Sequence, residues 1–226
     1  NLHSMRTILS ILMLFCTMIL SAQEIQENIL ENKTYLERMA YFKANPLTNG
    51  QIIFLGNSLT QGGKWNEYFP TQKPVNRGIS GDNTLGMLNR LNEIIIAKPK
   101  KVFLMAGIND ISLSRSNEKI MIGIKSIIYQ IETGSPYTKI YVQSLLPINN
   151  NRNVYQRMLN KEWQIEQLNK ELKAFCEKEN ITFINIYPAF LSEDRTLDTR
   201  YTTDGLHLND NGYTVWVDQI RKYVEE

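Results

Sequence analysis

Three polar residues have the types, and the order along the chain, of a nucleophile, the acid that orients a base, and the base itself. Ser58 follows an apolar run and a glycine, and Asp204 precedes His207 by three residues. Serine is a weak nucleophile and needs a base to take its proton. An aspartate at this spacing can accept the Nδ1–H of the histidine ring in a turn, which directs Nε2 toward the serine. The pattern predicts nucleophilic catalysis by Ser58, His207 and Asp204.

The histidine count makes His207 the one candidate for the base. The chain has 226 residues, with two histidines and two cysteines. His3 and Cys16 lie in a segment that we expect to be removed on export, which leaves His207 and Cys176. One cysteine cannot form an intrachain disulfide, and one cysteine with one histidine cannot supply the roughly four ligands of a structural zinc site. We therefore expect no metal and no cofactor, and we expect Cys176 to be a small core residue.

Acyl transfer also needs hydrogen-bond donors aimed at the oxyanion that forms when the nucleophile attacks. Gly81 can offer its backbone N–H from a glycine-bearing loop, and Asn109 can offer its side-chain amide. The backbone N–H of Ser58 would be a third donor. A glycine or an asparagine alone is equally typical of a turn. The prediction of an oxyanion hole therefore depends on a fold that brings the three residues together.

Apolar runs precede most of these polar residues and predict buried β-strands. The runs are rich in Ile, Val, Phe and Leu and lack clean alternation, which is typical of strands covered on both faces. They lie at 52–55, 75–79, 102–106, 140–144 and 181–186. Helical patterns lie at 24–43, 84–97, 118–132, 155–179 and 210–224. The alternation predicts an α/β fold with helices on both faces of a parallel sheet of about five strands, a three-layer αβα sandwich.

Four glycine-bearing segments are expected to meet at one edge of this sheet. In open α/β sheets, functional sites lie beyond the carboxyl ends of the strands. Three segments follow the first three strands, and the fourth precedes the last helix. They read GNSLT at 56–60, GISGD at 78–82, GIND at 107–110 and DGLH at 204–207. Their joint placement is more informative than any one of them.

These segments resemble the four motif blocks of the SGNH (GDSL) hydrolase family and occur in the family's order between residues 52 and 212. The resemblance implies a flavodoxin-like fold and hydrolysis of carboxylic esters. It implies Ser58 as nucleophile, His207 as base and Asp204 as the orienting acid. It also implies Ser58, Gly81 and Asn109 as the oxyanion hole.

One position departs from the family's first block, because Asn57 stands where the family has an aspartate. In the family this residue supports the nucleophile loop and is not the acid of the triad. Asparagine keeps a side-chain acceptor and adds a donor. We therefore expect an active enzyme, and we expect Asn57→Asp to be active as well.

Residues 76–82 and 201–213 also resemble the branch that holds platelet-activating-factor-acetylhydrolase-like enzymes and sialate O-acetylesterases. That branch acts mainly on short acyl groups, so the resemblance implies removal of O-acetyl groups from a small-molecule or glycan ester. Together with export, it favours carbohydrates such as sialic acids or plant glycans. For the substrate contacts we predict Asn57, Asp82 and Trp65, the last either stacked on a sugar ring or packed in the core.

The first 22 residues have the pattern of a secretory signal peptide. Arg6 precedes an apolar run at 8–20, and small residues follow at Ser21 and Ala22. The run is shorter than the roughly 20 residues of a membrane-spanning helix, so it favours a cleaved leader over an anchor. Residues 1–4 stand upstream of this leader. We expect a protein secreted to the periplasm or the medium, with one domain at 23–226.

Other functions remain open from the sequence. A lysophospholipase or thioesterase could use the same scaffold, and so could an inactive relative that binds sugar. A nucleotide- or flavin-binding module is disfavoured, because GGK at 62–64 lacks the other positions of a phosphate loop and GxGxxG is absent. The net charge of +2 argues against nucleic acid as a partner, and we expect no stable membrane association after cleavage. The oligomeric state is not predicted.

Overall fold

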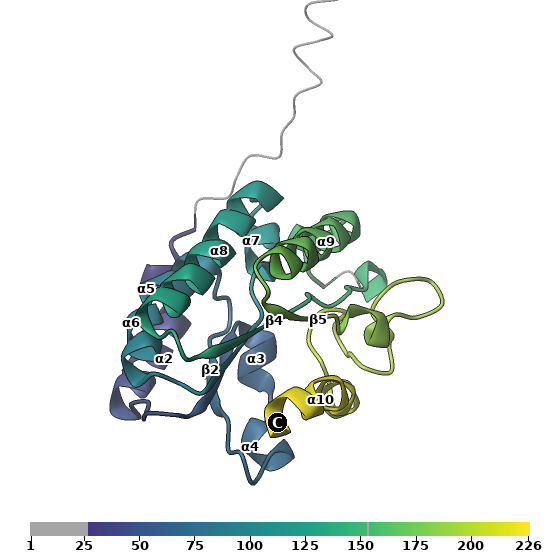
Figure 1. Cartoon of the computed structure of the whole chain (residues 1–226). Helices are drawn as coiled ribbons and strands as arrows, with labels where there is room; N and C mark the ends of the chain where they lie inside the picture. The colour runs from purple at the N-terminus through teal and green to yellow at the C-terminus, as the bar shows by residue number, and fades with distance from the viewer. Residues whose placement is uncertain (1–26, 153) are drawn as a thin grey trace, which may run out of the picture.

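A five-stranded parallel sheet forms the centre of the computed structural model, which describes residues 27–152 and 154–226 (Figure 1). Its strands lie in the order β2-β1-β3-β4-β5. They are β1 (Ile52–Gly56), β2 (Val75–Gly78), β3 (Lys101–Leu104), β4 (Lys139–Gln143) and β5 (Thr182–Ile184). The predicted α/β fold and its parallel sheet are confirmed. The expected leader at 1–22 lies outside the described residues.

Helices cover both faces of the sheet, as Figure 1 shows. One layer contains α5 (Thr84–Asn89), α6 (Leu91–Ala97), α8 (Asn117–Gly134) and α9 (Glu162–Lys178). The opposite layer contains α3 (Ser58–Gly62), α4 (Trp65–Tyr68) and α10 (Asp210–Glu225). The remaining helices are α2 (Lys33–Ala44), α7 (Ile108–Ser112), and the short 3₁₀ turns η1 (Ile29–Glu31), η2 (Asn150–Arg152), η3 (Gln156–Met158) and η4 (Tyr187–Phe190). Within the described part of the chain, no helix has the length and apolar character needed to cross a membrane.

A row of stacked aromatic rings fills the layer between the sheet and α10. Phe54, Phe103 and Tyr141 are in register on β1, β3 and β4, so their side chains point to the same face. Their rings stack with centroids 4.8 and 4.7 Å apart. Trp65 stacks on Phe54 at 4.2 Å and meets Trp216 of α10 edge-on at 5.1 Å. Large aromatic side chains each bury about 150–250 Å², so this row holds the α4 and α10 layer on the strands.

Three of the expected helices have different bounds in the structure. The opening helix begins only at Lys33, because Asn32 is extended and caps it by accepting the Thr34 and Tyr35 N–H groups. The pattern at 84–97 is two helices, broken at Arg90, whose backbone leaves the helical region. The expected helix at 155–179 begins at Glu162, because Asn160 has a left-handed backbone with φ 59° that no right-handed helix contains.

Candidate active site

The candidate site lies where the order of the strands reverses. From β1 the chain crosses to β2 at one edge, and from β3 it continues to β4 on the other side. The crevice between the carboxyl ends of β1 and β3 is therefore the switch point at which open α/β sheets bind ligands. Ser58 follows β1 and Asn109 follows β3, so both lie at this crevice.

Ser58 is the first residue of α3 and is half-buried. Asn57, before it, caps the helix by accepting the Leu59 N–H at 3.0 Å, which turns the chain sharply from strand to helix. Gly56 is required at this turn, because a Cβ there would lie 2.1 Å from Thr60 Oγ1 and 2.9 Å from the Met105 carbonyl oxygen. The turn presents the Ser58 hydroxyl at the end of the sheet.

The hydroxyl of Ser58 is hydrogen-bonded to the ring of His207, with Oγ 2.9 Å from Nε2. On the other side of the ring, Nδ1 lies 2.8 Å from Asp204 Oδ2. An ionised carboxylate only accepts hydrogen bonds, so Nδ1 carries the proton and Nε2 is free to accept the serine proton. The three predicted catalytic residues are thus connected in the order nucleophile, base and acid.

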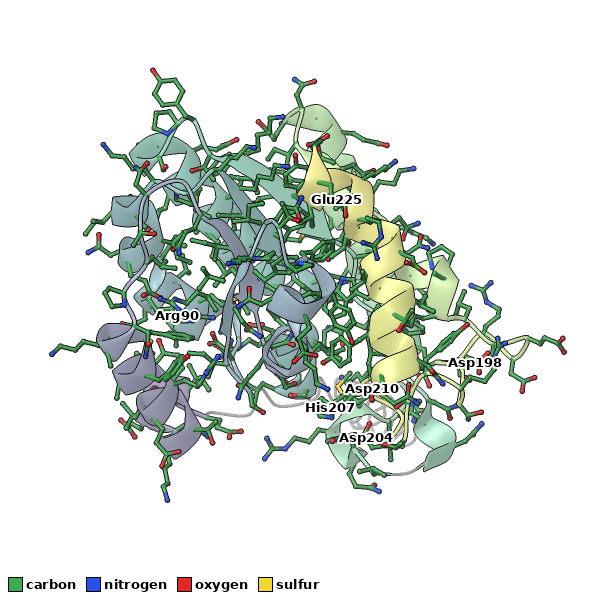
Figure 2. The ribbon with its side chains drawn as sticks, turned by 90° about the horizontal axis from the view of Figure 1, so that it is seen from below. Arg90, Asp198, Asp204, His207, Asp210 and Glu225 are labelled. Atoms are coloured by element: carbon green, nitrogen blue, oxygen red, sulfur yellow. The ribbon has the colours of Figure 1, made fainter. Side chains whose placement is uncertain are left out.

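The turn that carries Asp204 and His207 is held by its own side chains. Asp204 Oδ1 accepts the N–H groups of Leu206 and His207 at 2.9 and 2.7 Å. Gly205 has φ 88°, a conformation that favours glycine. Thr202 Oγ1 donates to the His207 carbonyl at 2.6 Å. Figure 2 shows Asp204 and His207 together near the beginning of α10, which Asp210 marks.

Asp204 is held in its ionised form. Burial raises the pKa of its carboxyl, but the hydrogen bonds from the His207 side chain, the Leu206 and His207 N–H groups and the Tyr155 hydroxyl outweigh burial and lower this pKa to about 2. A carboxylate that accepts several hydrogen bonds favours its charged form. Asp204 therefore remains an anion that can stabilise a protonated His207 throughout the neutral range.

Two further predicted donors face the same site. Gly81 is exposed and has φ 79°, and Asn109 is half-buried. Asn109 Nδ2 donates one hydrogen to the carbonyl of Asp82 at 2.7 Å. An amide nitrogen has two hydrogens, so this bond fixes the amide and leaves the second for another acceptor. The arrangement can stabilise negative charge beside Ser58.

These residues border a pocket of about 390 Å³. Its lining residues are Ser58, Ser80, Gly81, Ile108, Asn109, Ser112, Val154, Tyr155, Gln156, Arg157, Met158, Leu206 and His207. A hollow of about 770 Å³ between α2 and α6 has neither a serine nor a histidine in its lining, so its size does not make it the catalytic site. Among residues 27–152 and 154–226, no cluster of three or more His, Cys, Asp or Glu could hold a metal ion.

The three side chains predicted to contact substrate lie in the interior instead of the pocket. Trp65 is 1% exposed, stacks on Phe54 and donates to the Thr60 carbonyl, so it has no free face for a sugar. Asn57 is fully buried, its Oδ1 serves as the cap, and its Nδ2 has no partner. Asp82 is buried against Arg90. Asn57 and Asp82 hold their loops in place and Trp65 packs in the core, and burial separates all three from any ligand.

Tyr155 is a site residue that the sequence reasoning missed. Its hydroxyl donates to Asp204 Oδ2 at 2.9 Å and lies 3.0 Å from His207 Nδ1. Burial, the hydrogen bond to Asp204 and the charge of Asp204 raise the pKa of Tyr155 to about 12, so the hydroxyl keeps its proton. The apolar spacing that continues into α9 predicted a helix here. The polar character of residues 149–157 was the only signal of a loop beside the site.

The flavodoxin-like strand order, with a serine, a histidine and an aspartate connected at its switch point, defines the class of α/β acyl hydrolases. Residues 54–215 match the model of the GDSL-like Lipase/Acylhydrolase family, and the chain belongs to this family. It is a carboxylic ester hydrolase of the GDSL type.

Individual relatives agree with this assignment. Platelet-activating factor acetylhydrolase IB subunit alpha1 of Rattus norvegicus is 30% identical over 170 residues, which cover 73% of this chain and 70% of the relative. The structure of a GDSL-like lipase from Bacteroides thetaiotaomicron is similar with a TM-score of 0.72 at 25% identity, covering 85% of this chain and 97% of the other. An acetylxylan esterase from Geobacillus stearothermophilus has the same fold, with a TM-score of 0.64 at 18% identity over 80% of this chain and 96% of the other.

Proposed function

We propose that this chain is a secreted serine esterase that removes short acyl groups, foremost O-acetyl groups, from hydroxyl groups of carbohydrates. The observation that carries the proposal is the unbroken relay from Ser58 through His207 to Asp204, with 2.9 and 2.8 Å between the bonded atoms, beside the pocket. The similarity to platelet-activating factor acetylhydrolase subunits supports acetyl as the acyl part.

The reaction has two steps. Ser58 Oγ forms a bond to the ester carbonyl carbon while its proton moves to His207 Nε2. The N–H groups of Ser58 and Gly81 and the amide of Asn109 stabilise the oxyanion. The bond to the alcohol then breaks, and the alcohol leaves with the proton from Nε2. A water molecule, deprotonated by the same nitrogen, releases the carboxylic acid and restores Ser58.

A longer acyl group is the second candidate, and the pocket lining is the observation that favours it. Ile108, Val154, Met158 and Leu206 give the pocket an apolar side, and Val154 is 54% exposed. An apolar wall of this kind can contact an acyl chain as well as a sugar ring. The rates with 4-nitrophenyl esters from acetate to octanoate separate the two functions: acetate should be preferred, and a preference for octanoate identifies the lipase-like function.

The roles of Ser58 and His207 are tested by substitution. Ser58→Ala and His207→Ala should each lower kcat for 4-nitrophenyl acetate by about 10⁴-fold, as expected when one member of a triad is lost. Ser126→Ala on the exposed side of α8 is the matched control and should keep full activity. Acetate release from acetylated sialic acids, xylan fragments and amino sugars then identifies the alcohol. Near-normal turnover by a folded Ser58→Ala enzyme would rule out the proposed mechanism.

Export is part of the proposal and is supported by the leader pattern at 1–22. Expression of the full chain in a bacterial host, followed by fractionation and intact-mass measurement, tests it. A product that begins at residue 23 and lies outside the cytoplasm is expected. A product that keeps the leader and sediments with membranes would identify an anchor instead.

A further inference from the structure

The pocket beside Ser58 has one permanently charged side chain in its lining. Among the described residues that line it, Arg157 is the only lysine or arginine, and no aspartate or glutamate is present. Arg157 belongs to η3, so its place depends on the loop between β4 and α9. The other lining groups are apolar, hydroxyl or amide side chains, backbone, and the ring of His207. A positive charge at the side of an otherwise uncharged pocket selects for a negative group on the ligand.

Arg157 forms an exposed ion pair with Glu27, and this pair is easily broken. Its Nη1 lies 2.7 Å from Glu27 Oε2, and the two side chains are 54% and 49% exposed. Ion pairs at such exposure contribute about 0–1 kcal/mol, because water solvates both charges well when they separate. A carboxylate or phosphate can accept two parallel N–H bonds from one edge of a guanidinium, and this pairing is stronger when one side of the site is apolar. An anionic ligand can therefore displace Glu27 at small cost.

Glu27 approaches Arg157 from the side of the loop that carries Gly81. Ile29, two residues after Glu27, is 4% exposed, and its Cδ1 lies 4.0 Å from where a Cβ of Gly81 would stand. The segment that carries Glu27 therefore passes beside Gly81, while Arg157 lies on the loop that also carries Tyr155. The pair joins the loop that lines the pocket to a segment that passes beside Gly81.

We propose that Arg157 binds an anionic group, a carboxylate or a phosphate, on the ester substrate, and that Glu27 occupies the same donors when substrate is absent. The proposal rests on the esterase function proposed for Ser58 and adds the charge class of its substrate. Glu27 then acts as an internal competitor, so its removal should favour anionic esters, and only when Arg157 is present.

Four variants and three acetyl esters test this. The esters are 3-acetoxybenzoate, 3-acetoxyphenyl phosphate and the neutral 3-acetoxybenzamide, whose leaving groups are of similar size. The measured quantity is kcat/KM for each anionic ester divided by kcat/KM for the neutral one. Arg157→Gln should lower this ratio about tenfold, equivalent to about 1.4 kcal/mol. Glu27→Gln should raise it about two- to threefold, and the double variant should match Arg157→Gln.

Arg195→Gln is the matched control. Arg195 is also exposed and paired with a glutamate, 2.9 Å from Glu166, but it lines a different pocket. It should leave the ratio unchanged. The anionic ester whose ratio depends on Arg157 identifies carboxylate or phosphate as the group that is bound.

Two results would overturn the inference alone: an unchanged ratio for both anionic esters in Arg157→Gln, or an equal fall in Arg195→Gln, with neutral turnover that still depends on Ser58. If the wild-type protein hydrolyses none of the three esters, or does so equally after Ser58→Ala, the proposed function fails and the inference fails with it.

Discussion

At the scale of single residues, the site depends on how many donors one carboxylate accepts. Asp204 Oδ2 receives both the Nδ1–H of His207 and the hydroxyl of Tyr155, while Oδ1 receives two backbone N–H groups. The tyrosine ring also lies edge-on to the imidazole, with centroids 5.6 Å apart. Tyr155 therefore fixes the orientation of both partners and reduces the charge that Asp204 presents to the ring.

Tyr155→Phe removes one donor from Asp204 and keeps the ring. Asp204 Oδ2 then keeps the Nδ1–H of His207 but loses the hydroxyl that holds it from the loop after β4, so the two side chains are oriented less firmly and kcat/KM should fall. We expect kcat to fall less than tenfold, because the relay itself remains. Tyr187→Phe is the control, since its hydroxyl bonds Glu166 outside the pocket. An unchanged kcat/KM in Tyr155→Phe would show that the hydroxyl has no influence on the base.

At the scale of elements, a buried ion pair connects the loops that carry the catalytic groups. Arg90, at the break between α5 and α6, donates to Asp82 through Nε and to the Gly56 carbonyl through Nη2, at 2.9 and 3.1 Å. The Asp82 carbonyl in turn holds the amide of Asn109. Arg90 thus joins the end of β1 to Asp82, which follows Gly81 and holds Asn109.

Arg90→Met should destabilise the protein more than the double variant Arg90→Met with Asp82→Asn does. Burial raises the pKa of Asp82 to about 6, despite the opposing effect of Arg90, so the carboxylate is costly to keep without its partner. Breaking a buried pair from one side costs about 3–5 kcal/mol, whereas replacing both partners costs less. Urea denaturation should show a larger loss of unfolding free energy for Arg90→Met than for Arg90→Met with Asp82→Asn.

The exposed Arg221→Met on α10 serves as the comparison and should stay within about 0.5 kcal/mol of the wild type. A double variant that is as unstable as Arg90→Met would mean that the carbonyl contact to Gly56, and not the ion pair, carries the stability.

At the scale of the whole molecule, the site contributes to stability as well as to chemistry. Asp204, in the segment before α10, accepts a hydrogen bond from Tyr155 in the loop after β4 and another from His207 in its own turn. Its pKa in the folded protein, about 2, lies below its unfolded value, so folding favours the ionised form. The stabilisation is fully present above about pH 5 and is lost progressively as the pH falls through the folded pKa of about 2.

Asp204→Asn should therefore show a pH-dependent loss of stability. The difference in unfolding free energy between wild type and variant should include a contribution on the order of 2 kcal/mol near pH 6. This contribution should shrink as the pH falls below about 4, because the carboxyl of the unfolded wild-type chain takes up a proton there, while that of the folded protein stays ionised until about pH 2. Chemical denaturation at several pH values between 2 and 6 measures it. A difference that is constant over this range would show that Asp204 contributes no charge-dependent stability.

The sequence by itself determined the sheet, the order of its motifs and the segments of the site. Short apolar runs that alternate with helical patterns are typical of strands buried on both faces. Gly56 lies in a turn that a Cβ would block, and Gly205 has a positive φ that favours glycine. Asp204 and His207 are only three residues apart, so the turn between them could be predicted from the sequence.

Only the tertiary structure decided which neighbouring side chains reach the pocket. Trp65 went to the core because its ring fits the aromatic row, and Asp82 was buried by Arg90. Tyr155 and Arg157 came to the site because Asn160 delays the start of α9. These outcomes follow from contacts between residues far apart in the chain, which local periodicity does not contain. The catalytic residues thus lie in short motifs that the sequence shows directly. The side chains that line the pocket and select a substrate depended on tertiary packing.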